Sequence, residues 1–444
     1  MFEKEEEKLN ELRKHLEHVE LPQGEIDGAI LQGMERAIRE KQVRRTKRKK
    51  GLWTLAVSAV LLFTLITSIR VSPTFANAVS TIPGMEKIVA MIHYDKGLTA
   101  AIENDYYQVI DVSQTRENVT LTIDGVILDE SGMNVFYTVK SDEFLQNPEV
   151  RKVEINNSEI RPGSISYGFS PSDQAVKEFS NRIDFHFHDP TKFTDLGFSL
   201  LMKVKNAGKE IEFNIPFTVP KNVKPSVTYT LNKEVEIENQ KFTIEEVMIH
   251  PLRVGIKISI EPQNTMEILQ FEDLRLEDEQ GEIWGSIANV ASGREVSETE
   301  QIFYLQSNYF EKPKELYVRI NKLQAINKDE AVVILDTEKN QLVKSPKDGK
   351  LKLGDSNKSQ ADLFMNEITD DAYGFNLASS VKDANGKLIG TPSVSMRYDS
   401  GQKERHLVIE FETTNYLNPL YLEIDAYPNY IEGDVKVELK KPNK

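Results

Sequence analysis

The sequence contains no cysteine. This absence excludes a disulfide scaffold, cysteine-ligated zinc, an iron–sulfur cluster and a thiol nucleophile. Basic residues are fewer than acidic ones, 55 against 70, and the net charge of −15 argues against a general nucleic-acid-binding surface. The H-E-x-x-H, G-x-S-x-G and Walker signatures are also absent. We therefore expect a protein that is not an enzyme, uses no cofactor or metal and makes no direct contact with nucleic acid.

One stretch, Gly51–Ile69, lacks charge altogether. It separates residues 1–50, with 13 basic and 11 acidic side chains, from residues 70–444, with 42 basic and 59 acidic ones. As a helix it would measure roughly 28 Å at ~1.5 Å per residue, which is close to the thickness of a bilayer core. Trp53 in its first turn suits the membrane interface. The sequence predicts a transmembrane helix over 51–69, because the alternative of a buried globular helix would need protein on every side.

The flanks of this stretch predict its orientation. The twenty residues before it hold nine lysines and arginines, and the twenty after it hold two. The positive-inside rule then places the N-terminus in the cytoplasm and residues 70–444 outside the cell membrane. A basic run precedes the stretch and is expected to lie against anionic headgroups of the bilayer, although a nucleic-acid patch is the alternative. The run consists of Arg44, Arg45, Lys47, Arg48, Lys49 and Lys50.

A cleaved signal peptide is the rival interpretation of the apolar stretch. Ala76 and Ala78 form an A-x-A pattern that resembles a cleavage site. The 50 residues in front are long for a signal peptide, and the stretch exceeds the usual 7–15 apolar residues. We favour an uncleaved anchor, and regulated cleavage near Ala76 and Ala78 stays open.

The cytoplasmic head, residues 1–50, has the pattern of two short amphipathic helices separated by Leu21–Gly24. Helices of this size cannot build a stable core alone, so their apolar stripes need a partner. The head is then either a tether or a docking element that folds around a cytoplasmic protein. The stripes are Leu9, Leu12, Leu16 and Val19 in the first helix, and Ile26, Ile30, Met34 and Ile38 in the second.

Residues 70–444 predict a mainly β fold of tandem antiparallel, immunoglobulin-like sandwiches. A helical linker is expected over 70–106, because apolar residues recur there at helical spacing, and period-two alternation begins after it. We expect a first sandwich over 107–222 and a second over 223–345. Residues 346–444 form either a third β unit or the closing strands of the second.

A weak internal repeat supports the second sandwich. Leu121–Leu128 matches Phe242–Ile249 in register. Val135–Val139 then matches Val254–Ile258, with two residues fewer between the matched segments. Both pairs have the pattern of a hairpin.

The best candidate for chemistry in the body is the segment Asp184–Asp189. On a strand, Asp184, His186 and His188 point to one face and could share a metal ion. The simpler interpretation is a solvent-exposed face opposite a core face formed by Ile183, Phe185 and Phe187. Likewise, Asp129–Gly132 has part of a calcium-loop pattern, but it is also a good hairpin turn.

Several segments resemble a known family: Ser72–Val79 (SPTFANAV), Ile92–Leu98 (IHYDKGL), Val119–Asp124 (VTLTID) and Phe136–Val139 (FYTV). They are similar to bacterial single-span membrane proteins whose extracytoplasmic domain has no known function. Many of these resemble anti-sigma regulators beside extracytoplasmic-function sigma factors, and the region from Asn232 resembles an immunoglobulin-like domain that often follows.

The resemblance implies a cytoplasmic segment that binds a sigma factor and an ectodomain that senses a component of the cell wall or envelope. An exported body without cysteine fits a Gram-positive envelope. The rival hypothesis is a non-enzymatic surface interaction protein whose head is only an anchor.

Overall fold

The computed structural model describes residues 85–92, 94–168, 175–221, 223–287, 293–366, 376–390, 392–399 and 404–440. Every described residue belongs to one compact unit within Ser72–Lys444. Among these residues, no helix is long and apolar enough to cross a membrane. The predicted span, both apolar stripes of the head, the basic run and Ala76–Ala78 lie outside the described residues and stay predictions.

Helices α5 (Met85–Ile92) and α6 (Lys96–Glu103) precede the first strand. On α5, Met85, Ile88 and Ile92 are buried, which is the spacing of one helical face. Asp95 caps α6 by accepting a hydrogen bond from the backbone N of Leu98 at 3.0 Å. The helices share a hydrophobic cluster with Phe136 of the first sandwich. They are therefore part of the folded body.

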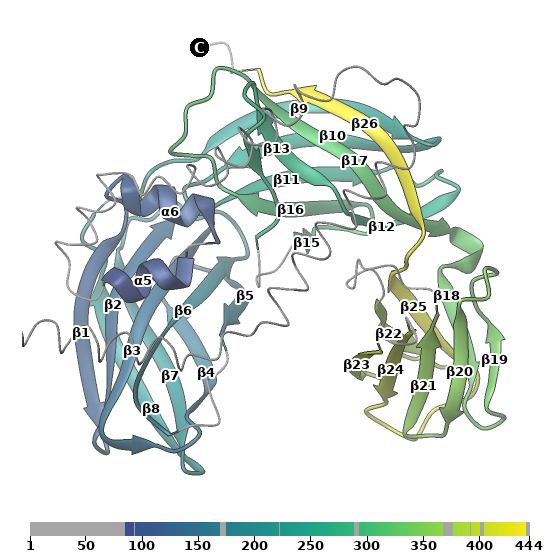
Figure 1. Cartoon of the computed structure of the whole chain (residues 1–444), viewed down its shortest axis with the longest axis horizontal. Helices are drawn as coiled ribbons and strands as arrows, with labels where there is room; N and C mark the ends of the chain where they lie inside the picture. Colours follow the sequence, from purple (N-terminus) through teal and green to yellow (C-terminus); the bar gives the residue numbers. More distant parts are fainter. Residues whose placement is uncertain are drawn as a thin grey trace, which may run out of the picture. The chain divides into compact units, whose positions relative to one another are not determined.

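The first sandwich consists of two antiparallel sheets, with strand orders β1-β2-β3-β6-β5 and β4-β7-β8 (Figure 1). Alternate side chains of both sheets point inward and form one hydrophobic core. One open edge is closed by a side chain, because the amide of Gln114 donates to the backbone O of Asn214 at 3.3 Å and accepts from its backbone N at 3.0 Å. The strands are β1 (Gln108–Arg116), β2 (Val119–Asp129), β3 (Gly132–Leu145), β4 (Glu149–Asn156), β5 (Pro162–Tyr167), β6 (Val176–Phe187), β7 (Gly197–Asn206) and β8 (Lys209–Thr218).

The second sandwich repeats this topology. Its first sheet has the order β9-β10-β11-β16-β15, which corresponds strand by strand to β1-β2-β3-β6-β5. Its second sheet has the order β12-β17-β13-β14, and β26 pairs with β17. The strands are β9 (Val227–Ile237), β10 (Gln240–Ile249), β11 (Arg253–Ile260), β12 (Met266–Phe271), β13 (Leu274–Asp278), β14 (Ile283–Trp284), β15 (Gly293–Glu295), β16 (Glu300–Gln306), β17 (Leu316–Asn327) and β26 (Tyr430–Glu438).

A β-bulge marks the same place in both sandwiches. The pairing of β2 with β3 shifts between Ile123 and Gly125, and the pairing of β10 with β11 shifts between Ile244 and Glu246. Asp124 and Glu245 are therefore equivalent residues. Beyond the bulges, Leu128 pairs with Met133 and Ile249 pairs with Val254. The equivalent of Val254 is thus Met133, so the two-residue gap in the sequence alignment is wrong and the hairpins have equal length.

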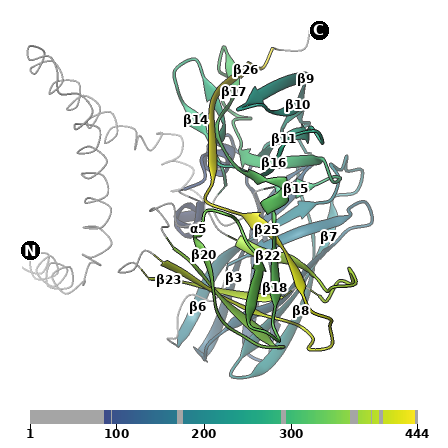
Figure 2. The ribbon, with the colours of Figure 1, turned by 90° about the vertical axis from the view of Figure 1, so that its right-hand side faces the viewer.

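A third pair of sheets interrupts the second sandwich. Strand β17 continues through the short helix η1 (Lys328–Glu330) into sheets of order β19-β18-β25-β22 and β20-β21-β24-β23, which enclose a core of their own. The chain then returns as β26 to pair with β17 (Figures 1 and 2). In the first sandwich a tight turn at Ala207 and Gly208 fills this place, between β7 and β8. The inserted strands are β18 (Val332–Asp336), β19 (Gln341–Lys344), β20 (Leu351–Ser356), β21 (Gln360–Met365), β22 (Asn376–Lys382), β23 (Ser393–Asp399), β24 (Glu404–Glu410) and β25 (Leu420–Ala426).

Candidate functional site

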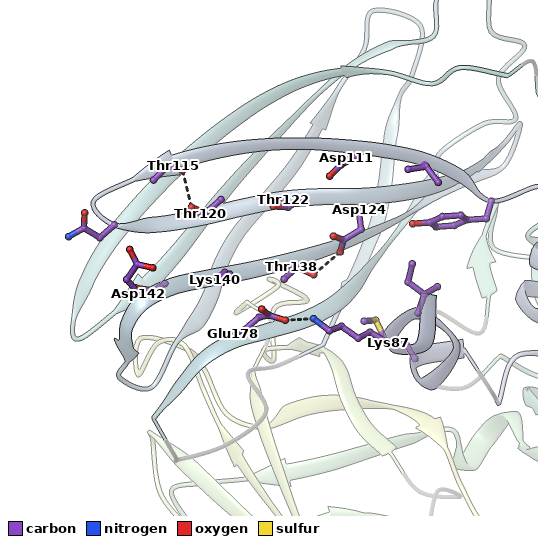
Figure 3. Close-up of a pocket in the computed structure, with 16 residues that line it drawn as sticks. Lys87, Asp111, Thr115, Thr120, Thr122, Asp124, Thr138, Lys140, Asp142 and Glu178 are labelled. Atoms are coloured by element: carbon purple, nitrogen blue, oxygen red, sulfur yellow. Dashed lines mark hydrogen bonds and ion pairs between the residues drawn. The ribbon is translucent and has the colours of Figure 1, made fainter. Parts of the chain in front are cut away.

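A groove of about 630 Å³ lies on the outer face of the first sandwich, and α5 contributes to its wall (Figure 3). Its floor is formed by polar side chains of β1, β2, β3 and β6. Hydroxyl groups and carboxylates dominate this floor, while the α5 end is more apolar. The lining comprises Lys87, Ile88, Met91, Tyr107, Val109, Asp111, Thr115, Asn118, Thr120, Thr122, Asp124, Thr138, Lys140, Ser141, Asp142 and Glu178.

The alternation of β2 creates this floor. Leu121 and Ile123 point into the core and are fully buried, so Thr120, Thr122 and Asp124 point outward. Such a row of polar side chains is also what a solvated sheet face would carry. The groove differs from a flat face because α5 stands at one end of it.

Two polar interactions organise the middle of the groove (Figure 3). The hydroxyl of Thr138 donates to Asp124 Oδ2 at 2.8 Å, and Lys87 of α5 forms an ion pair with Glu178 of β6. Burial raises the pKa of the Asp124 carboxyl. The Thr138 hydrogen bond and the Lys87 charge oppose this shift of the pKa, whereas Asp111 and Glu178 add to it. Asp111 and Glu178 thus add negative charge around Asp124, and Lys87, which offsets it, is itself paired with Glu178.

A second polar cluster, the junction, is buried where the β2–β3 turn meets the β10–β11 turn. Asp129 Oδ1 accepts from the backbone N of Ser131 at 2.7 Å and of Gly132 at 3.0 Å, while Oδ2 accepts from the backbone N of Leu252 at 2.6 Å. Next to it, Glu130 Oε2 lies 4.0 Å from His250 Nδ1. Equivalent turns of the two sandwiches are thus tied together by the first turn's acidic side chains.

Arg253 is the central cation of the junction. Its side chain is buried, and its guanidinium lies 5.7 Å from the ring centre of Tyr304. Arg182 Nη2 lies 3.0 Å from Asp184 Oδ2. Burial raises the pKa of Asp184, and the charges of Arg182 and Arg253 oppose this. Burial, reinforced by Arg253, lowers the pKa of His186 to about 3.

The junction corrects the expectation of a solvent-exposed face around Asp184. Asp184 and His186 are 7% and 5% exposed, so that expectation is wrong. The second sandwich covers them, because Tyr304 packs edge-on to the His186 ring and Arg253 lies nearby. His188 is instead partly exposed and its Nδ1 lies 3.0 Å from Asp189 Oδ2. Within the described ranges, no three His, Cys, Asp or Glu side chains are placed to hold a metal ion.

Sequence reasoning missed the groove as a site. Its signal was present in β2, where Thr120, Thr122 and Asp124 alternate with core residues, but the same pattern fits any half-buried strand. By contrast, Asp129–Gly132 forms the expected hairpin turn.

Comparisons with known proteins find two family models. Residues 46–141 match a domain of unknown function (DUF4179), and residues 226–353 match a family of unknown function (DUF5643). No curated protein matches the chain. Among solved structures, the conserved domain protein from Bacillus anthracis aligns with 12% identity and a TM-score of 0.38, covering 76% of this chain and 92% of that one.

Proposed function

We propose that the chain is a single-pass membrane regulator that holds an alternative sigma factor in the cytoplasm and senses the envelope outside. In this proposal residues 1–43 bind the sigma factor through the two apolar stripes. Residues 51–69 cross the bilayer, and immunoglobulin-like sandwiches form the sensor. The resemblance to anti-sigma-like membrane proteins supports this assignment, as does the DUF4179 match, which begins in the basic run and extends into the first sandwich.

The observation that carries the proposal is the burial of α5 and α6. These helices begin 16 residues after the predicted span, at Met85, and pack into the body. A Cβ built on Gly97 of α6 would lie 2.7 Å from the backbone N of Ser307 in the second sandwich. Tyr106, just after α6, donates from its hydroxyl to the backbone O of Leu128 in the first sandwich at 2.7 Å. A simple anchor needs no such contacts, whereas a sensor needs its ligand-binding body joined to the span.

The test of topology uses the full-length chain with a C-terminal tag in a Gram-positive host. Protease added to intact protoplasts is expected to remove the tag, because the body lies outside. A protected tag, or a freely soluble chain, would contradict the membrane proposal.

The test of sigma-factor binding uses the same chain, purified in detergent. A sigma factor is expected to co-purify, and Leu12→Asp combined with Ile30→Asp is expected to abolish this, because both changes place a charge on an apolar stripe. Glu11→Gln is the matched control, since Glu11 adjoins Leu12 but is not part of the stripe. If no sigma factor co-purifies with the unaltered chain, the head is only an anchor.

A further inference from the structure

Among the described residues Asp124 has no ion-pair partner, whereas its counterpart in the second sandwich, Glu245, has one. Both Asp124 and Glu245 are the extra residue of equivalent bulges. Glu245 Oε2 lies 2.7 Å from Lys257 Nζ, and this lysine also lies 3.3 Å from Glu300 Oε2. Within the described part of the chain, Asp124 forms no such ion pair and accepts its hydrogen bond from Thr138.

The reason lies in the residue that replaces the lysine. Gly125 pairs with Phe136, and Glu246 pairs with Lys257, so Phe136 occupies the place of Lys257. Phe136 is fully buried and packs edge-on against Tyr107 at a ring distance of 5.6 Å. Where the second sandwich has Lys257 paired with its bulge carboxylate, the first sandwich has a hydrophobic contact beneath the helices. Its bulge carboxylate is left facing the groove.

The shape of the groove suits a chain rather than a point charge. Asn118 and Asp124 are six positions apart along the chain, which is roughly 20 Å at about 3.3 Å per residue of strand. Along this length, outward side chains recur at every second residue, as do the side chains of an extended peptide. The hydroxyls of Thr120 and Thr122 already form hydrogen bonds of 2.9 Å with those of Thr115 and Ser113, and each keeps an acceptor lone pair that suits a peptide N–H group.

The groove carries more acidic than basic side chains, which favours a positively charged ligand. Asp111, Asp124 and Asp142 line it together with Glu178, against Lys87 and Lys140. Lys87 is already engaged by Glu178. At the helix end, Val109 is 48% exposed, which offers apolar surface to the aliphatic stem of a lysine side chain.

We propose that this groove binds an extended basic peptide, with one ammonium or guanidinium group placed at Asp124 where the second sandwich uses Lys257. The inference deepens the proposed function by naming the ligand class of the sensor. Because Lys87, Ile88 and Met91 of α5 line the groove, a bound peptide contacts the first described helix after the predicted span.

The experiment measures binding of tetralysine to the full-length chain in detergent by isothermal titration calorimetry, with tetraglutamate and an amino-sugar tetramer as parallel ligands. Saturable binding of tetralysine alone is expected, weakening as salt rises because the contacts are electrostatic. Asp124→Asn is expected to weaken it about tenfold, through loss of a charge-assisted hydrogen bond. Glu245→Gln is the matched control at the equivalent bulge, where Lys257 already fills the site, and is expected to leave binding unchanged.

A second variant tests the idea of a missing cation directly. Thr138→Lys places a lysine beside Asp124, as Lys257 stands beside Glu245, and is expected to abolish binding while leaving the chain folded. Absence of saturable tetralysine binding, or equal weakening by Glu245→Gln, would overturn the proposal. Preference for the amino-sugar tetramer would overturn the peptide assignment. Sigma-factor co-purification plays no part in this measurement, so failure here leaves the proposed function to its own test.

Discussion

The side chain of Asp129 accepts a hydrogen bond of 2.6 Å from the backbone N of Leu252, and this bond joins the two repeated hairpins. Both ends of the contact are buried. In the first hairpin the turn begins with an aspartate, and its equivalent in the second hairpin is His250. The two repeats therefore carry different side chains at equivalent turns. The first turn supplies carboxylate acceptors, and the second supplies the backbone N of Leu252 that donates to one of them.

Replacing Asp129 with alanine is expected to destabilise the body by about 2–4 kcal/mol, because buried N–H groups of two turns lose their acceptor. The measurement is denaturant unfolding followed by tryptophan fluorescence. The sequence has two tryptophans, so a Trp53→Phe background leaves Trp284, 3% exposed in the second sandwich, as the reporter.

Asp383→Ala is the control for Asp129→Ala. Asp383 organises a turn of the inserted sheets, accepting from the backbone N of Asn385 at 2.9 Å and of Lys387 at 3.1 Å. It should leave the Trp284 transition nearly unchanged. If both variants shifted the Trp284 transition equally, Asp129 would contribute no more to the stability of the second sandwich than Asp383 does, and the prediction would be wrong.

Acidification is expected to weaken the junction through His186. Its pKa is about 3 in the folded body, lowered by burial and Arg253, against ~6.5 when unfolded. Between these values the unfolded chain binds the proton and the folded chain does not, so stability falls as pH drops below ~6.5. The loss amounts to about 2 kcal/mol at about pH 5.

The comparison with His186→Gln isolates this effect. Burial raises the pKa of Asp95 and of Asp184, so their protonation in the folded state adds stability as pH falls and opposes the histidine. Both proteins keep these carboxyls, so the difference between their pH profiles reports His186. Unfolding at a series of pH values should show a steeper acid loss for the unaltered chain, and parallel profiles would contradict the prediction.

Local patterns predicted the strands better than their partners. The mainly β class was confirmed, and the alternating segments Phe198–Val204 and Leu420–Ala426 lie in β7 and β25. The apolar residues Ile155 and Ile160 do not share one strand, because β4 (Glu149–Asn156) ends before Asn157, whose backbone O accepts from the backbone N of Ile160 at 3.4 Å. Alternation detects a half-buried strand but not its ends.

Long-range pairing lay beyond the sequence patterns. Nothing local to Tyr430–Glu438 indicates that it pairs with β17 across the inserted sheets. The burial of His186 also depends on Tyr304 and Arg253, more than sixty residues away in sequence. Predicting the groove requires both the outward face of β2 and the position of α5 against it. Period-two alternation indicates only the first of these.

Gly125→Ala is expected to destabilise the first sandwich by a few kcal/mol, as overpacking does. A Cβ built there would collide with the Tyr107 ring and lie 2.6 Å from the backbone O of Gln108. Gly285→Ala is the matched control, because a Cβ there meets nothing within 4 Å. Thermal unfolding of both variants should separate them clearly. If Gly125→Ala unfolds like Gly285→Ala, then Tyr107 does not pack against β2 as described.

Removing the inserted sheets is expected to leave the second sandwich folded. Residues 325–429 would be replaced by Ala-Gly, the turn that joins β7 to β8 in the first sandwich. Gln324 already pairs with Tyr430, as Asn206 pairs with Lys209, so the shortened β17 and β26 can form the equivalent hairpin. Some stability is lost, because Ala325 belongs to the core of the second sandwich. Cooperative unfolding reported by Trp284 would support an insertion into a duplicated sandwich. Loss of that transition would mean instead that the inserted sheets are needed to hold β26 against β17.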